Sequence, residues 1–238
     1  MMEKFDVNYQ VPVEERGDMK APLIIMIDKS ASLSGYDNAI EDGIQQMKEI
    51  IMEDDIARGR IEVSLILFGA GAEIVHPFTQ VTRLEVPHVV CDGSRTDTHA
   101  AVELALKAAD ARKAEYKRLN VGHYQPILWL LTDGYANDRD NGSFKDLLDR
   151  QKDGKAVFFG FSIGDNQNIA ALGAMNKDGI FLSCSADDIG NAFAYLASSS
   201  VGVSSTNPGE RVRIEAPDRN SGIAVKQIDT KYIGELDV

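Results

Sequence analysis

Three short segments of this sequence carry hydroxyl and carboxylate side chains at points where an apolar run ends or a helical pattern begins. The segments are Asp28-Lys29-Ser30-Ala31-Ser32, Arg95-Thr96-Asp97-Thr98 and Thr132-Asp133-Gly134. Oxygen ligands of these kinds suit Mg²⁺, which takes six of them in a nearly octahedral array and usually keeps several waters. We therefore predict one divalent-cation site with ligands from Asp28, Ser30, Ser32, one threonine of the second segment (Thr96 or Thr98) and Asp133.

The neutral hydroxyls in this ligand set have a chemical consequence. A cation held largely by serine and threonine keeps positive charge and an open position, which suits the carboxylate of another molecule. Taken one at a time, the same residues have simpler interpretations: Asp28, Ser30 and Thr96 suit helix N-caps, and Asp133-Gly134 suits a turn. The occurrence of all three segments in order favours the metal site.

The elements that must position these segments are strands and helices in alternation. Apolar runs of strand length precede the first and third segments, and an amphipathic helix pattern follows the first. The expected strands are 23–27, 61–68, 126–131, 156–161 and 180–182, and the expected helices are 37–51, 98–117, 143–152, 169–175 and 186–197. This alternation predicts an α/β fold with a Rossmann-like, mainly parallel central sheet flanked by helices, and ligands of such sheets bind at the carboxyl ends of the strands.

The order of the remaining segments predicts the limits of the domain. Residues 72–78 follow a Gly69-Ala70-Gly71 turn and are expected to form one antiparallel edge strand. The chain becomes rich in serine after Leu196, which is typical of a linker. We predict an N-terminal extension at 1–20, the domain at 21–205 and an extended tail at 206–238, with a short strand at 211–214.

The composition restricts the partners. The 238 residues carry a formal net charge of −12, which disfavours binding to nucleic acids or to an anionic membrane. Two cysteines are too few for a disulfide framework or a zinc cluster. The first 20 residues hold no apolar stretch like that of a signal peptide, so we expect a cytoplasmic protein.

The three segments resemble the metal-ion-dependent adhesion site (MIDAS) of von Willebrand factor A (VWA) domains, whose pattern is Asp-x-Ser-x-Ser, a distant Thr and a distant Asp. This resemblance implies direct metal contacts from Ser30, Ser32 and Thr96, with Asp28 and Asp133 acting directly or through water. Thr96 is preferred to Thr98 because the related Gly-Arg-Thr-x-Thr form places the ligand first. The resemblance also implies a non-enzymatic module that binds Mg²⁺, Mn²⁺ or Ca²⁺ and captures an Asp or Glu of a protein partner.

Further segments resemble the stand-alone bacterial VWA proteins associated with tellurium resistance and stress response. The segments are Ala21–Ile24, Asp54–Val63, Leu130–Gly134 and Asn207–Glu210. This likeness implies a cytoplasmic scaffold that works beside a protein kinase and a phosphatase of the metal-dependent 2C type.

Two residues of the first segment depart from the family pattern. Ala31 stands where the family usually has glycine, which disfavours a positive φ there. Lys29 stands where a neutral residue is common, and its ammonium group could compete with a cation. Both departures predict weaker metal binding.

Two alternative functions follow from the same sequence. Gly160-Phe161-Ser162-Ile163-Gly164 matches the nucleophile-elbow pattern of a serine hydrolase, although all four histidines precede Ser162, against the chain order of that fold. The other alternative is a structural VWA module that binds no metal and uses the same loops for protein contact.

Overall fold

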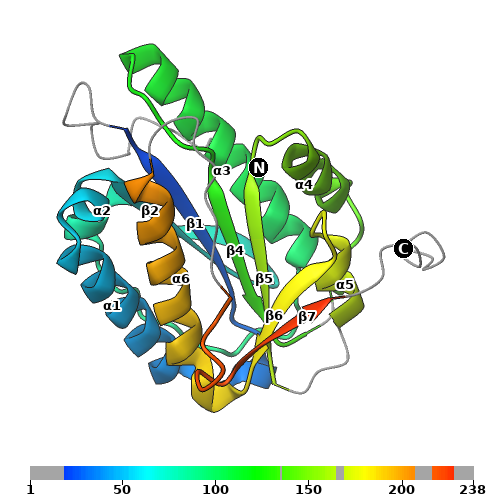
Figure 1. Ribbon diagram of the computed structural model, residues 1–238. Helices are drawn as coiled ribbons and strands as arrows, with labels where there is room; N and C mark the ends of the chain where they lie inside the picture. Colours follow the sequence, from blue (N-terminus) through cyan, green and yellow to red (C-terminus); the bar gives the residue numbers. More distant parts are fainter. Residues whose placement is uncertain (1–18, 135, 165–168, 207–215, 228–238) are drawn as a thin grey trace.

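The computed structural model describes residues 19–134, 136–164, 169–206 and 216–227. Within these residues, seven strands form one sheet in the order β3-β2-β1-β4-β5-β6-β7. The strands are β1 (Ala21–Asp28), β2 (Ile61–Gly69), β3 (Gly71–Gln80), β4 (Ile127–Thr132), β5 (Val157–Ile163), β6 (Ile180–Cys184) and β7 (Ile223–Gln227). Helices cover both faces of the sheet (Figure 1).

The five central strands run parallel. β1 pairs with β2 and β4, β4 with β5, and β5 with β6, all in parallel register. β3 folds back against β2 in antiparallel register, as predicted for the edge strand. The predicted α/β class with a mainly parallel sheet is therefore confirmed, and β7 adds a second antiparallel strand at the opposite edge.

The described helices divide into two layers. They are α1 (Asp37–Glu53), α2 (Asp55–Arg60), α3 (Thr98–Leu119), α4 (Ser143–Lys152), α5 (Ile169–Ala174) and α6 (Ile189–Ser205). Successive residues of a strand point to opposite faces of the sheet. Leu23, Ile25 and Ile27 of β1 accordingly share a core with α1 and α6, while Ile24 and Met26 share one with α3. Both faces of β1 are buried, which explains its continuous apolar run.

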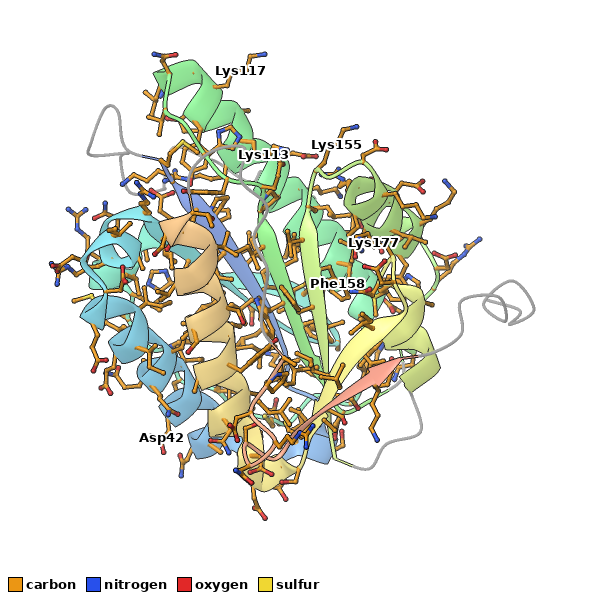
Figure 2. The ribbon with its side chains drawn as sticks, viewed as in Figure 1. Asp42, Lys113, Lys117, Lys155, Phe158 and Lys177 are labelled. Carbon is orange, nitrogen blue, oxygen red and sulfur yellow. The ribbon has the colours of Figure 1, made fainter. Side chains whose placement is uncertain are left out.

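Charged side chains cover the outer surfaces of these layers. Asp42 of α1 and Lys117 of α3 point away from the sheet, as does Lys155 in the connection between α4 and β5 (Figure 2). Phe158 of β5, by contrast, lies in the core shared with α3.

The serine-rich stretch after Leu196 is helical, so its interpretation as a linker was wrong. α6 continues to Ser205 because Ser200 and Ser204 face the buried side, where Ala197 and Val203 also lie. The hydroxyls of Ser198 and Ser204 donate back to the carbonyls of Ala194 and Val201, so the helix itself satisfies them.

β7 lies within the segment predicted as an extended tail. Its five residues pair with all five of β6, from Ile180 with Gln227 to Cys184 with Ile223. No alternating apolar pattern marks Ile223–Gln227 strongly, which is why the sequence did not indicate a strand there. The strand predicted at 211–214 lies outside the described residues.

Candidate metal centre

The first and third predicted segments meet at the carboxyl ends of β1 and β4. The Ser32 hydroxyl donates to Oδ1 of Asp133 at 2.9 Å, and the Ser30 hydroxyl lies 3.5 Å from the same oxygen. The two serine hydroxyls are 3.0 Å apart. Two serines of the first segment and an aspartate more than 100 positions further along the chain thus come together at one edge of the sheet.

Asp28 forms the buried floor of this cluster. Its Oδ1 accepts from the backbone N–H of Ser30 at 2.8 Å, and its Oδ2 accepts from the hydroxyl of Thr132 at 2.6 Å. Burial raises the pKa of Asp28 above its ordinary value, and the negative charge of Asp133 adds to this, whereas the bonds from Thr132 and Ser30 act in the opposite direction. Hydrogen bonds from Ser30 N–H and from the Thr132 hydroxyl therefore hold the Asp28 carboxyl group in place.

The second segment approaches from the start of α3. Thr96 is buried. A Cβ atom added to Gly134 would lie 3.2 Å from the hydroxyl oxygen of Thr96. The hydroxyl of Thr96 is thus adjacent to the residue that follows Asp133. The Thr98 hydroxyl is also buried and has no hydrogen-bond partner among the described residues, so the preference for Thr96, which lies beside Gly134, stays a prediction.

A short bridge fixes the backbone of the first segment. Gly93 N–H donates to the carbonyl of Lys29, and Ala31 N–H donates to the carbonyl of Gly93. A Cβ on Gly93 would lie 3.1 Å from the Lys29 carbonyl oxygen, so a glycine allows this close approach. Gly93 contributes to the geometry of the loop, and its importance was not evident from the sequence.

Neither departure from the family pattern distorts the first segment. Ala31 begins a 3-10 turn at Ala31–Leu33, and Asn120 is the one non-glycine residue with positive φ among the described residues. Lys29 directs its ammonium group to Glu73 on β3, with 3.4 Å between Nζ and Oε1. The ammonium group of Lys29 therefore forms an ion pair with Glu73 of the β2–β3 hairpin.

Two further residues outside the predicted ligand set support the second segment. Asp138 lies in the connection between β4 and α4, and its carboxylate accepts from the N–H groups of His99 and Ala100. It caps the first turn of α3, whereas Asp97, the residue at the N-cap position, makes no side-chain cap bond. Asn137 bonds to Thr96 itself. Caps supplied from about 40 positions away leave no local signal in the sequence.

The donor set fits a hard divalent cation. Two carboxylates and three hydroxyls are all oxygen donors, as Mg²⁺, Mn²⁺ and Ca²⁺ prefer. In the part of the chain that the structure describes, no group of three or more His, Cys, Asp or Glu side chains is placed to hold a metal. The oxygen atoms that do come together among the described residues are those of Ser30, Ser32 and Asp133.

Ser162 does not occupy a nucleophile elbow. It lies inside β5, paired with Thr132 on one side and Ser183 on the other, and it is 2% exposed. An elbow requires the serine on a sharp turn between strand and helix, with its hydroxyl accessible. The hydrolase pattern in the sequence is therefore not matched by this geometry.

None of the described helices combines the length and the apolar character needed to cross a membrane.

Solved structures share this fold. The pilus adhesin SpaC from Lactobacillus rhamnosus GG aligns with a TM-score of 0.60 at 13% identity, over 79% of this chain and 31% of that protein. Proximal thread matrix protein 1 from the mussel byssus aligns with a TM-score of 0.54 at 15% identity, over 77% and 48%. A von Willebrand factor type A protein from Catenulispora acidiphila gives 0.52 at 15% identity, over 77% and 43%. This chain thus spans less than half the length of each. A search of curated protein sequences gave no significant match.

The family model of the von Willebrand factor type A domain matches residues 23–197. The match begins in β1 and ends within α6, so it includes the three loops that hold the candidate ligands. The chain belongs to the family of von Willebrand factor type A domains.

Proposed function

We propose that this protein is a non-enzymatic interaction module that binds a divalent cation, Mg²⁺ in the first place, at Asp28, Ser30, Ser32, Thr96 and Asp133. The partner is a protein that offers an Asp or Glu carboxylate. The observation that carries the proposal is the convergence of Ser30, Ser32 and Asp133, whose side-chain oxygens lie within 3.5 Å of one another. Such clustering of oxygen donors is what a hard cation requires.

The cation, when bound, supplies a Lewis-acidic position that an anionic oxygen can occupy. The residues of this chain have separate tasks in that arrangement. Ser30, Ser32 and Thr96 offer neutral oxygens, so the positive charge is only partly offset. Asp28 accepts hydrogen bonds from Ser30 N–H and from the Thr132 hydroxyl, and these bonds fix the first loop. Oδ1 of Asp133 lies within 3.5 Å of both serine hydroxyls.

Thermal unfolding tests the metal site directly. We expect Mg²⁺ or Mn²⁺ to raise the melting temperature of the wild-type protein, since a ligand present at 100 times its Kd adds about 2.7 kcal/mol of stability. The rise should vanish in Asp133→Ala and in the Ser30→Ala/Ser32→Ala double variant. Matched controls are Asp92→Ala and Ser34→Ala, which remove the same groups from exposed positions nearby. Equal melts of the wild-type protein with and without cations would leave the metal-free module as the correct alternative.

The kind of partner that we propose is based on the resemblance of this sequence to a group of bacterial VWA proteins. The likeness of Asp54–Val63 and Leu130–Gly134 to bacterial stress-response and tellurium-resistance VWA proteins supports a cytoplasmic scaffold. A protein kinase or a 2C-type phosphatase is then the expected partner. The net charge of −12 favours a protein partner over nucleic acid or an anionic membrane.

A binding assay tests the capture of a carboxylate. A kinase or phosphatase retained by the immobilised wild-type protein in Mg²⁺ should be released by EDTA and should not bind Asp133→Ala. Within that partner, a single Asp→Asn or Glu→Gln change should abolish retention. A partner that binds equally well in EDTA would contradict the proposed mode of capture.

A further inference from the structure

The connection between β4 and α4 lies against Thr96 and pairs with it at two points. The side-chain oxygen of Asn137 accepts from Thr96 N–H at 2.9 Å, and Asn137 N–H donates to the Thr96 carbonyl at 3.1 Å. We propose that Asn137 is a positioning residue that sets the Thr96 hydroxyl for the cation. This inference rests on the proposed function of the site.

The pairing restrains the whole backbone of residue 96. Its N–H has the Asn137 amide oxygen as partner, and its carbonyl accepts from Thr98 N–H as well as from Asn137 N–H. A third bond runs from Arg95 Nη2 to the Asn137 carbonyl at 3.3 Å. Because the Thr96 side chain projects from this fixed backbone, Asn137 determines where its hydroxyl lies without touching the cluster itself.

The other side of the same segment is tied to the hairpin between β2 and β3. Asp97 N–H donates to the Gly69 carbonyl at 2.9 Å, and the Asp97 carboxylate accepts from Gly71 N–H at 2.7 Å. Residues 96 and 97 are thus held from both flanks, by the hairpin and by Asn137. Removal of the Asn137 side chain leaves Thr96 N–H without its acceptor, and on that flank only the backbone bond from Asn137 N–H to the Thr96 carbonyl remains.

The surroundings of Asn137 allow its positioning of Thr96 to be tested apart from any contribution of its side chain to the stability of the fold. The residue is exposed and contributes no apolar surface to either core, so its side chain can be removed without opening a cavity. Side chains that orient metal ligands in this indirect way typically change metal affinity 10–100-fold when they are removed.

Asn141 offers a matched control in the same connection. It is also an asparagine whose side chain reaches α3, with Nδ2 donating to the His99 carbonyl and to Glu103. None of its side-chain bonds involves residue 96.

Titration with Mn²⁺, followed by the electron paramagnetic resonance signal of the free ion, tests the inference. We expect Asn137→Ala to weaken Mn²⁺ binding about tenfold or more, and Asn141→Ala to leave it unchanged. Asn137→Asp keeps the acceptor oxygen and should bind at least as tightly as the wild type. In EDTA, the melting temperatures of the two alanine variants should be similar.

A double-mutant cycle shows whether Asn137 acts through Thr96. If it does, Asn137→Ala should cause little further loss of affinity in a Thr96→Ala background. Full additivity, unchanged affinity in Asn137→Ala, or an Asn137→Asp variant as weak as Asn137→Ala would each overturn the inference while the wild type still binds Mn²⁺. A wild-type protein without Mn²⁺ binding would refute the proposed function and, with it, this inference.

Discussion

The hydroxyl of Thr132 donates a 2.6 Å hydrogen bond to Oδ2 of Asp28, and both residues are buried at the ends of neighbouring strands. The same hydroxyl accepts from Gly134 N–H at 3.2 Å. One side chain therefore joins the end of β1 to the loop that carries Asp133. This link holds two parts of the candidate site in register before any cation arrives.

Thr132→Val keeps the shape of this side chain and removes its hydroxyl. Because a buried carboxyl group would lose a hydrogen-bond partner, we expect the free energy of unfolding in EDTA to fall by about 1.5–3 kcal/mol. Denaturation in urea, monitored by circular dichroism, measures this free energy of unfolding. Thr132→Ser, which keeps the hydroxyl, should retain more of the stability. Equal losses in the two variants would show that the methyl group matters and the bond to Asp28 does not.

Gly134→Ala places a methyl group 3.2 Å from the Thr96 hydroxyl and 3.5 Å from its Cγ2. The threonine must move by a few tenths of an ångström, so we expect a smaller rise in melting temperature on addition of Mg²⁺. Gly202→Ala is the control, because its new methyl meets no atom within 4 Å on the exposed side of α6. That variant should gain up to about 1 kcal/mol of stability. A full response to Mg²⁺ in Gly134→Ala would argue against Thr96 as a ligand.

The convergence of the first and third segments was predictable from the sequence because both follow the ends of strands. The apolar run Leu23–Ile27 and the strand before Asp133 locate two loops on one edge of a parallel sheet, whatever the details of packing. The contacts of Asn137 and Asp138 were not predictable in this way. They connect residues about 40 positions apart, and neither residue differs in type from an ordinary loop residue.

The limits of the sheet were harder to predict for a different reason. Serine is common in linkers, yet in α6 the hydroxyls of Ser198 and Ser204 bond to their own helix, and Ser200 and Ser204 are buried. β7 has a half-exposed Val225 and charged or polar residues at its end, because an edge strand buries only part of its surface. The composition of a segment indicates the structure in which its residues usually occur, but it does not show which residues they contact in this fold.

A buried ion pair on β2 gives a prediction about stability. Glu62 Oε2 accepts from Nε and Nη2 of Arg112 at 2.8 and 2.6 Å and also from the Tyr116 hydroxyl, and all three side chains are buried. Arg112→Met leaves the carboxylate buried without its counter-charge, so we expect a loss of about 3–5 kcal/mol in the free energy of unfolding.

Two variants make that measurement decisive. The double replacement Glu62→Met/Arg112→Met should be more stable than Arg112→Met, because no buried charge is left unpaired. Lys145→Met breaks the exposed pair with Asp149, which solvent screens, and should leave the stability nearly unchanged. Comparable effects of Arg112→Met and Lys145→Met would contradict the importance of burial.

The two thiols should be unreactive in the folded protein. Burial raises the pKa of both Cys91 and Cys184 to about 12, with a further contribution from Asp37 at Cys91 and from Asp188 at Cys184. The thiolate is the nucleophile, and the raised pKa makes it scarce at neutral and mildly alkaline pH. Ellman's reagent at pH 8 should therefore modify neither thiol in the native state and both in guanidinium chloride. Rapid native labelling of either cysteine would contradict the burial of its side chain.

The place of β7 at the edge of the sheet has a consequence for synthesis on the ribosome. The nascent chain delivers β1 to β6 and α6 before residues 223–227 emerge, so β6 remains an open edge until nearly the last of the sheet is translated. Unpaired edges of this kind are where strands of other molecules can add. A gene truncated after codon 205 would make that exposure permanent, and we expect its product to self-associate more readily than the full chain.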